Sequence, residues 1–134
     1  MSKRDGNLRT EFKKNLKDFM WIPVETWATS GPGVPDSWYI APTGISGWIE
    51  YKRPPHKVTI EQGATLSRMV RMGGRAFVAL RLEETELRIY HGNVAPQMAQ
   101  LTYSKLREAV PYLGAWTGLP ARWDWGQIRI ILGG

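Results

Sequence analysis

Residues 33–53 read GVPDSWYIAPTGISGWIEYKR, which is the pattern of two short strands joined by a tight turn. Residues 38–41 and 47–53 form the two runs, and Pro-Thr-Gly at 42–44 is a turn signal between them. The two prolines that follow end the second strand, because proline has no N–H to donate to a strand ladder. We therefore predict a β-hairpin that begins directly after Asp36.

The hairpin carries two carboxylates and one amine in positions where they can meet. Side chains alternate between the two faces of a strand, so Glu50 and Lys52 point the same way, about 6–7 Å apart. Asp36 lies at the mouth of the neighbouring strand, and pairing of the two strands brings it towards Glu50. We expect these three side chains to share one patch.

Such a patch has the chemistry of a divalent-cation site. Two carboxylates placed together repel each other, and a cation relieves that repulsion. Hard oxygen ligands suit Mg²⁺ or Mn²⁺, and Mg²⁺ often takes only one or two carboxylates besides water and substrate phosphates. The cation lowers the pKa of a bound water and offsets charge on a phosphodiester, while a nearby lysine orients that water or stabilises the transition state. The residues therefore predict phosphodiester hydrolysis.

The pattern of residues 34–36 (VPD) followed by residues 48–52 (WIEYK) resembles the PD-(D/E)XK nuclease superfamily. Its Gly-x-Pro-Asp form, which starts at Gly33, is similar to the VRR-NUC branch and to the small Holliday-junction resolvases of phages and archaea. The resemblance covers residues 8–82, and residues 83–134 are not explained by it. It implies an α/β fold, with a restriction-endonuclease-like central mixed β-sheet flanked by helices.

The same resemblance implies the roles of the hairpin residues. Asp36 and Glu50 would be the metal-binding carboxylates, and the backbone carbonyl of Tyr51 would be a further metal ligand. Lys52 would be the catalytic lysine. The expected cofactor is Mg²⁺ or Mn²⁺.

Two helix residues would complete the catalytic group by the same resemblance. Many members of the superfamily carry a glutamate on the first helix, and the matching residue is Glu11. The VRR-NUC branch often has a glutamine on the helix after the motif, which Gln62 matches. Gln62 also shares a helical stripe with Leu66, Met69 and Gly73, which is unusual for a purely solvated glutamine.

A second interpretation assigns these residues no chemistry. Glu50 and Lys52 then form a surface salt bridge, as charged residues on a strand usually do, and Asp36 is a turn residue. Glu11 and Gln62 are then ordinary solvated side chains on their helices.

The remaining sequence predicts helices around further strands. Apolar residues at helical spacing, which are Leu8, Phe12, Leu16, Phe19 and Met20, predict a first helix. The other expected elements are an extended stretch at 24–29, a loop at 30–36, a helix at 59–72, strands at 76–82 and 86–90, a helix at 95–110 and a strand at 127–132. A mixed sheet flanked by helices is the natural packing for this order.

Length and composition fit one folded domain. The chain has 134 residues, and we expect a single nuclease-like domain over 1–134, with a core at 8–82 and a C-terminal extension at 83–134. Cysteine is absent, which excludes disulfides, thiolate zinc sites and a cysteine nucleophile. Neither an apolar run of about 18 residues nor a secretory signal is seen, so we expect an intracellular protein without a membrane span.

Charge favours a polyanionic partner. Eighteen Lys and Arg against twelve Asp and Glu give a net charge of +6, which suits DNA. The residues expected to contact DNA phosphates are Lys13, Lys14, Lys17, Arg53, His56, Lys57, Arg68, Arg71 and Arg75. Three tryptophans of the C-terminal part, Trp116, Trp123 and Trp125, either stack on bases or, as we expect, fill a core or a dimer interface.

The sequence therefore predicts a metal-dependent DNA endonuclease. Its small size leaves no extra domain to read a base sequence, which favours a structure-specific enzyme such as a junction resolvase of phage type. Analogy to such nucleases implies a homodimer, and a phage or prophage source would fit the size. Three alternatives remain: a nuclease that trims or nicks branched or single-stranded DNA, a catalytically silent nucleic-acid-binding module of the same fold, and a structural or interaction protein.

Overall fold

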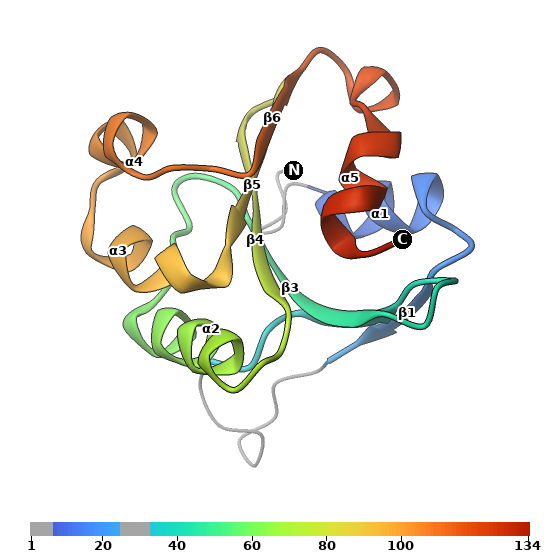
Figure 1. The fold of residues 1–134 in the computed structure, drawn as a ribbon. Coiled ribbons are helices and arrows are strands. Elements are labelled where there is room, and N and C mark those ends of the chain that lie inside the picture. Colours follow the sequence, from blue (N-terminus) through green and yellow to red (C-terminus); the bar gives the residue numbers. More distant parts are fainter. Residues whose placement is uncertain (1–6, 25–32) are drawn as a thin grey trace.

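The computed structural model describes residues 7–24 and 33–134, in which a six-stranded mixed sheet runs through the centre (Figure 1). The strands are β1 (Met20–Pro23), β2 (Ser37–Ile40), β3 (Ser46–Lys52), β4 (Ala76–Glu83), β5 (Glu86–His91) and β6 (Gly114–Thr117). The helices are α1 (Leu8–Asn15), α2 (Ile60–Arg71), α3 (Ala95–Gln100), α4 (Tyr103–Ala109) and α5 (Trp125–Leu132), with 3₁₀ turns η1 (Gly92–Val94) and η2 (Pro120–Arg122).

The strands lie in the sheet in the same order as in the chain. Neighbouring strands are antiparallel except β3 and β4, which are parallel and are connected through α2. In the β2–β3 pair Ser37 lies opposite Ile49, so continuing the register places Asp36 opposite Glu50. The predicted hairpin is confirmed, and its register brings the two carboxylates to the same level of the sheet.

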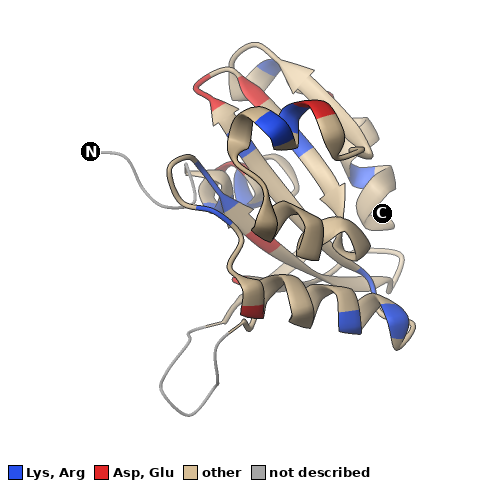
Figure 2. Cartoon of the chain, turned by 90° about the vertical axis from the view of Figure 1, so that its left-hand side faces the viewer, with Lys and Arg blue, Asp and Glu red and all other residues tan. Residues whose placement is uncertain are grey.

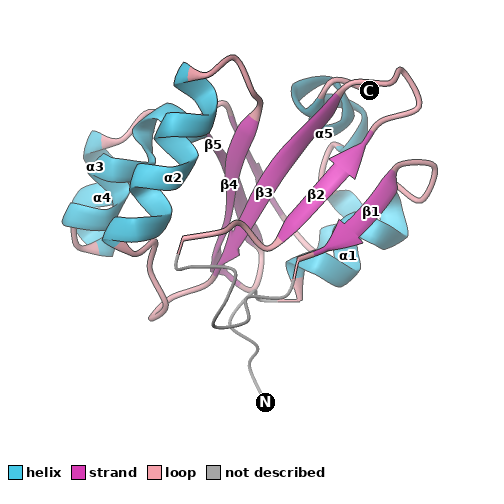
Figure 3. Ribbon diagram, turned by 90° about the horizontal axis from the view of Figure 1, so that it is seen from below, coloured by secondary structure: helices cyan, strands magenta, loops and turns pink. Residues whose placement is uncertain are grey.

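Helices cover both faces of the sheet and create two apolar cores (Figures 1 and 3). On one face α1 and α5 bury Phe12 and Ile128 against Tyr51 and other side chains of the strands. On the other face α2, α3 and α4 pack over β3, β4 and β5, with Leu66 at the centre. Because side chains alternate along β3, Tyr51 points to the α1 face while Glu50 and Lys52 point to the α2 face.

The sequence prediction is confirmed for much of this architecture. The mixed sheet flanked by helices agrees with the expected α/β class. The helix predicted at 59–72 is α2, and the strands predicted at 76–82 and 86–90 are β4 and β5. Thr59 begins α2 with a capping box, in which its side chain accepts from the Gln62 N–H and the Gln62 side chain accepts from the Thr59 N–H.

The strand predicted at 127–132 is wrong, because these residues form most of α5. Three isoleucines and a leucine favour a strand by propensity. Ile128 and Leu132 are nevertheless both fully buried, which is the i, i+4 spacing of one helix face, and Asp124 caps the helix by accepting from the Gln127 N–H. Packing against the core and the cap together outweigh the β-propensity of this segment.

Other boundaries also differ from the prediction. The first helix ends at Asn15, and Met20 belongs to β1 instead. The helix predicted at 95–110 is two helices, because the chain is extended at Leu101 and Thr102, where Thr102 caps the start of α4. The edge strand β6 was not predicted at all.

Two further expectations concern a segment that the structure leaves out. Residues 25–32, which include most of the extended stretch expected at 24–29 and the start of the loop expected at 30–36, lie outside the described residues.

None of the described helices has the length and apolar character needed to span a membrane.

Candidate functional site

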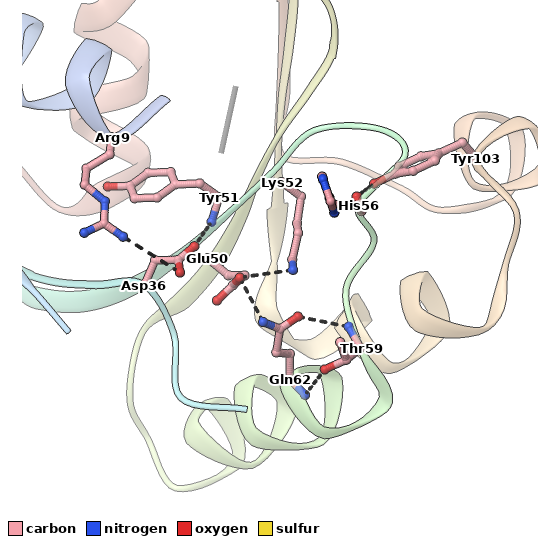
Figure 4. A network of polar contacts seen from close by, with 9 residues as sticks. All are labelled: Arg9, Asp36, Glu50, Tyr51, Lys52, His56, Thr59, Gln62 and Tyr103. Carbon is pink, nitrogen blue, oxygen red and sulfur yellow. Dashed lines mark hydrogen bonds and ion pairs between the residues drawn. The ribbon is translucent and has the colours of Figure 1, made fainter. Parts of the chain in front are cut away.

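Asp36 is held at the point where β2 and β3 separate. Its backbone carbonyl accepts a hydrogen bond from the Val24 N–H at 2.9 Å, which ties it to the end of β1. Its side-chain Oδ2 accepts from the Tyr51 N–H, also at 2.9 Å. Directly before the start of β2, the Asp36 carboxylate therefore takes the place of a main-chain hydrogen-bond partner of β3 (Figure 4).

This contact also orients the Tyr51 peptide. In an extended strand the N–H and C=O of one residue point to the same edge of the strand. Since the Tyr51 N–H points towards Asp36, the Tyr51 carbonyl faces the same side, beyond the end of β2 and away from β4. The Tyr51 carbonyl oxygen and the Asp36 carboxylate thus lie on the same side of β3.

Glu50 lies next to Asp36 and is buried, with 2 % of its surface exposed (Figure 4). Its Oε2 accepts from Gln62 Nε2 at 3.0 Å and lies 3.4 Å from Lys52 Nζ (Figure 4). Its other oxygen, Oε1, is buried and has no hydrogen-bond partner among residues 7–24 and 33–134. The second interpretation given above, in which Glu50 and Lys52 form a surface salt bridge, does not fit this buried carboxylate.

The electrostatics of the site follow from this placement. Burial, and after it the charge of the nearby Asp36 carboxylate, raise the pKa of Glu50 to about 8, while the positive charge of Lys52 opposes this rise. The charge of Asp36 acts on Glu50 because the two carboxylates lie close together at the end of the sheet. The protein therefore holds Glu50 where both its burial and the charge of Asp36 disfavour its ionisation.

Gln62 links the carboxylate to the start of α2. Its amide oxygen accepts from the Thr59 N–H at 2.9 Å while its amide nitrogen donates to Glu50. One side chain thus serves both the cap of α2 and the orientation of Glu50. Of the two helix residues expected at the site, the structure brings Gln62 to it.

Glu11 lies away from these contacts. Its carboxylate accepts from Asn15 Nδ2 at 3.4 Å within α1. At about 100° per residue, Arg9 and Glu11 flank the buried stripe of Leu8 and Phe12 on opposite sides of the helix. Arg9 is on the flank towards the site, with its guanidinium 3.9 Å from Asp36 Oδ1.

Arg9 is the site residue that sequence reasoning missed. The periodicity of α1 identifies the stripe that faces the core, but it does not tell which flank of that stripe faces the carboxylates. A search for arginines or lysines beside the same stripe would have included Arg9 as an equal candidate to Glu11.

The predicted DNA-contacting residues fall into two groups. Five of them are exposed on the first two helices or next to them, namely Lys13, Lys14, Lys17, Arg68 and Arg71. Figure 2 shows the side of the molecule formed by α2, α3 and α4. It carries both acidic and basic residues, and the basic residues in the last turn of α2 are among them.

The other four surround the loop after β3 or meet α5. Arg53 pairs with Glu84, and the His56 carbonyl accepts from the Tyr103 hydroxyl. Lys57 is half-buried in the same loop. Arg75 donates to the Ile131 carbonyl at 3.3 Å, which gives it a partner within the fold. A role of any of the nine in binding DNA stays a prediction.

The C-terminal tryptophans belong to the core on the α1 side. Trp116 and Trp123 are buried, and Trp125 packs against the same cluster, with its ring 5.2 Å from that of Phe12. Each indole N–H has an acceptor inside the fold, as buried tryptophan requires. The expectation that these residues fill a core is confirmed.

The donor set of the site fits a small hard cation. Asp36, Glu50 and the Tyr51 carbonyl supply oxygen, which is the ligand that Mg²⁺ and Mn²⁺ prefer. The orphaned Oε1 of Glu50 is a buried acceptor that a cation would satisfy. Within residues 7–24 and 33–134 no group of three His, Cys, Asp or Glu side chains is placed to bind one metal ion. The acidic side chains of this site, among the described residues, are therefore those of Asp36 and Glu50.

Comparison with solved structures finds a similar fold in Hjc, a Holliday junction resolvase from the archaeal hyperthermophile Archaeoglobus fulgidus. The match has a TM-score of 0.51 and 20% sequence identity, and covers 92% of this chain and 94% of that one. This likeness confirms the predicted α/β class with its restriction-endonuclease-like sheet. No family model and no curated protein matches the chain.

Proposed function

We propose that this protein is a metal-dependent endonuclease that hydrolyses DNA phosphodiester bonds. The observation that carries the proposal is that the Asp36 carboxylate lies next to that of the buried Glu50, which also has Lys52 beside it. A buried carboxylate whose pKa is raised by its burial and by a second carboxylate beside it, and whose Oε1 has no hydrogen-bond partner among the described residues, is arranged for a cation rather than for the stability of the fold.

Each residue of the site would have its own role in this reaction. Asp36, Glu50 and the Tyr51 carbonyl would hold Mg²⁺ or Mn²⁺, which supplies charge for the phosphodiester and lowers the pKa of a bound water. Lys52 would orient the attacking water or stabilise the charge that develops on the phosphate. Gln62 keeps Glu50 in place from the first turn of α2.

Branched DNA is the substrate we favour. A solved structure with a similar fold is a Holliday junction resolvase, and the net charge of +6 suits a polyanion. In this proposal the shape of the DNA supplies the selectivity. A homodimer with two active sites, an intracellular location and a phage or prophage source belong to the same proposal, and membership of the VRR-NUC branch stays a prediction.

The test compares cleavage of four-way junctions, linear duplex and single strands in Mg²⁺, in Mn²⁺ and in EDTA. The wild-type protein should cut the junction only with a cation present. Glu50→Gln and Lys52→Ala should abolish cutting while DNA affinity is retained. Lys105→Ala, an exposed substitution on α4 outside the site, is the matched control and should cut like the wild type.

One observation favours a second candidate, a catalytically silent DNA-binding module of the same fold. The first helix presents Arg9 rather than Glu11 to the carboxylates, so the described residues offer no third acidic side chain. A silent module would show salt-dependent DNA affinity and no cleavage with any cation. The same panel of substrates separates the two candidates.

A further inference from the structure

Arg9 reaches the site because its helix is anchored next to it. Phe12, one turn further along α1, is fully buried with its ring 5.6 Å from that of Tyr51. Residues three apart lie on neighbouring positions of a helix surface, so Arg9 is carried to the same part of β3. Its guanidinium lies 5.9 Å from the Tyr51 ring centre and 3.9 Å from Asp36 Oδ1 (Figure 4).

The ion pair does little for the stability of the fold. The Arg9 and Asp36 side chains are 35% and 30% exposed, and pairs of this length and exposure are generally weak. Its chemical effect is more direct. Asp36 Oδ2 already accepts the Tyr51 N–H, so Arg9 occupies the space next to the oxygen that is left for another cation.

We propose that Arg9 is a placeholder for the divalent cation at Asp36 and becomes a phosphate-binding residue when the cation enters. This inference rests on the proposed function. Before metal binds, the guanidinium compensates part of the charge of Asp36. A divalent cation at Asp36 repels it, and the flexible side chain turns to a non-bridging oxygen of the DNA phosphodiester.

The chemistry of arginine suits this second position. A guanidinium presents several N–H donors in a planar fork that matches the oxygens of a phosphate. Its partial exposure leaves it free to reach a ligand at the surface, while contact with the Tyr51 ring limits how far it moves. The substrate class is therefore a nucleic-acid backbone, and the contact carries no information on base sequence.

The first arm of the test measures cation binding without DNA. Mn²⁺ is titrated into the metal-free protein at low ionic strength and followed by calorimetry. Arg9→Gln should bind Mn²⁺ about three- to tenfold more tightly than the wild type, the effect of removing one charge a few ångströms away. Arg9→Lys keeps the charge and should bind like the wild type, as should Lys105→Gln, which removes a charge from α4.

The second arm measures affinity for a four-way junction in Ca²⁺ as a cation expected not to support cleavage. Arg9→Gln should weaken binding, and should reduce the slope of log affinity against log salt by about one, because one phosphate contact is lost. Circular dichroism of each variant shows whether it is folded.

The outcomes separate the two proposals. Mn²⁺ affinity that is unchanged or weaker in Arg9→Gln overturns the placeholder role, as does an equal tightening in Arg9→Lys. Unchanged DNA affinity in Arg9→Gln overturns the phosphate contact. If the wild type itself binds no Mn²⁺, or if Asp36→Asn binds it as well as the wild type, the proposed metal site fails as well.

Discussion

Glu50 is the residue on which the chemistry of this protein depends most. Burying a carboxyl group is unfavourable unless its oxygens are paired, and Glu50 has one oxygen in contact with Gln62 and Lys52 while the other has no hydrogen-bond partner in the described part of the chain. Replacement by an apolar residue would be easier for the fold. We infer that the site keeps a destabilising group because its ligand needs one.

The raised pKa of Glu50 predicts how the metal-free protein responds to pH. In the folded state the raised pKa of Glu50 keeps its proton up to about pH 8, whereas an unfolded glutamate loses the proton near its ordinary pKa of 4.5. The folded state therefore binds more protons between these values, and the free energy of unfolding falls as pH rises through that window. Below it, the contribution of Glu50 is fully present.

The measurement is urea denaturation in EDTA at several values from about pH 5 to pH 8. Relative to Glu50→Gln, the wild type should lose at least about 1 kcal/mol across this range, the equivalent of one pKa unit. Asp36→Asn should reduce the loss without removing it, because burial is the larger cause. Identical pH profiles for the wild type and Glu50→Gln would show that Glu50 titrates normally.

At the scale of elements, the chain before β2 must pass very close to α2. Gly33 has a φ of +92°, and a Cβ at this position would lie 2.6 Å from the Glu61 carbonyl oxygen and 2.7 Å from Thr65 Oγ1. Glycine therefore lets residues 33–36 run against the helix that carries Gln62. This close approach sets how far Asp36 lies from α2, the helix that carries Gln62.

Gly33→Ala should consequently destabilise the protein more than Gly44→Ala does. Gly44 has a similar φ of +88°, but a Cβ there meets nothing within 4 Å. Both variants carry the backbone strain of about 1–3 kcal/mol, and only Gly33→Ala adds the clash with α2. Thermal unfolding of both proteins measures the difference, and equal losses of stability would contradict the close approach.

The sequence predicted the elements around the site better than those at the end of the chain. The hairpin has alternating side chains and a strong turn signal, and α2 has a capping residue and a closing Gly-Gly, so local chemistry defines both. The segment at 127–132 has the composition of a strand. Its helical form depends on Asp124 and on a core to which distant parts of the chain contribute, and such packing is not visible in a local pattern.

The same distinction applies to the site. Asp36, Glu50 and Lys52 could be grouped from strand alternation and pairing alone. The choice between Arg9 and Glu11 depends on the rotation of α1 about its axis, which the contact of Phe12 with Tyr51 determines. Rotation of a helix against a sheet is a tertiary property, so the sequence left this choice open.

At the scale of the whole molecule, the C-terminal half is integrated with the segment that carries the site. Carbonyl groups at the end of α5 accept hydrogen bonds from three separate parts of the chain: that of Ile131 from Arg75, that of Leu132 from the Tyr39 hydroxyl, and that of Gly133, directly after the helix, from the Thr43 hydroxyl. Side chains thus satisfy carbonyl groups that a helix end leaves unpaired. They fix α5, which packs beside α1 in one core and so supports the helix that carries Arg9.

Symmetric cleavage of a four-way junction requires two active sites, so we predict a homodimer in solution. Light scattering coupled to size-exclusion chromatography should give twice the mass of the chain, both alone and with one junction bound. A dimer should also cut the junction at two symmetrically related positions. A monomer that stays a monomer on the junction would favour the nicking or trimming nuclease instead.

The most direct measurement is the anomalous scattering of Mn²⁺ in crystals of the wild-type protein grown or soaked with that cation. We predict a peak in contact with Asp36, Glu50 and the Tyr51 carbonyl, and its loss in crystals of Asp36→Asn. Well-ordered Asp36 and Glu50 side chains without a peak between them, at Mn²⁺ concentrations that support cleavage, would contradict the proposed metal site.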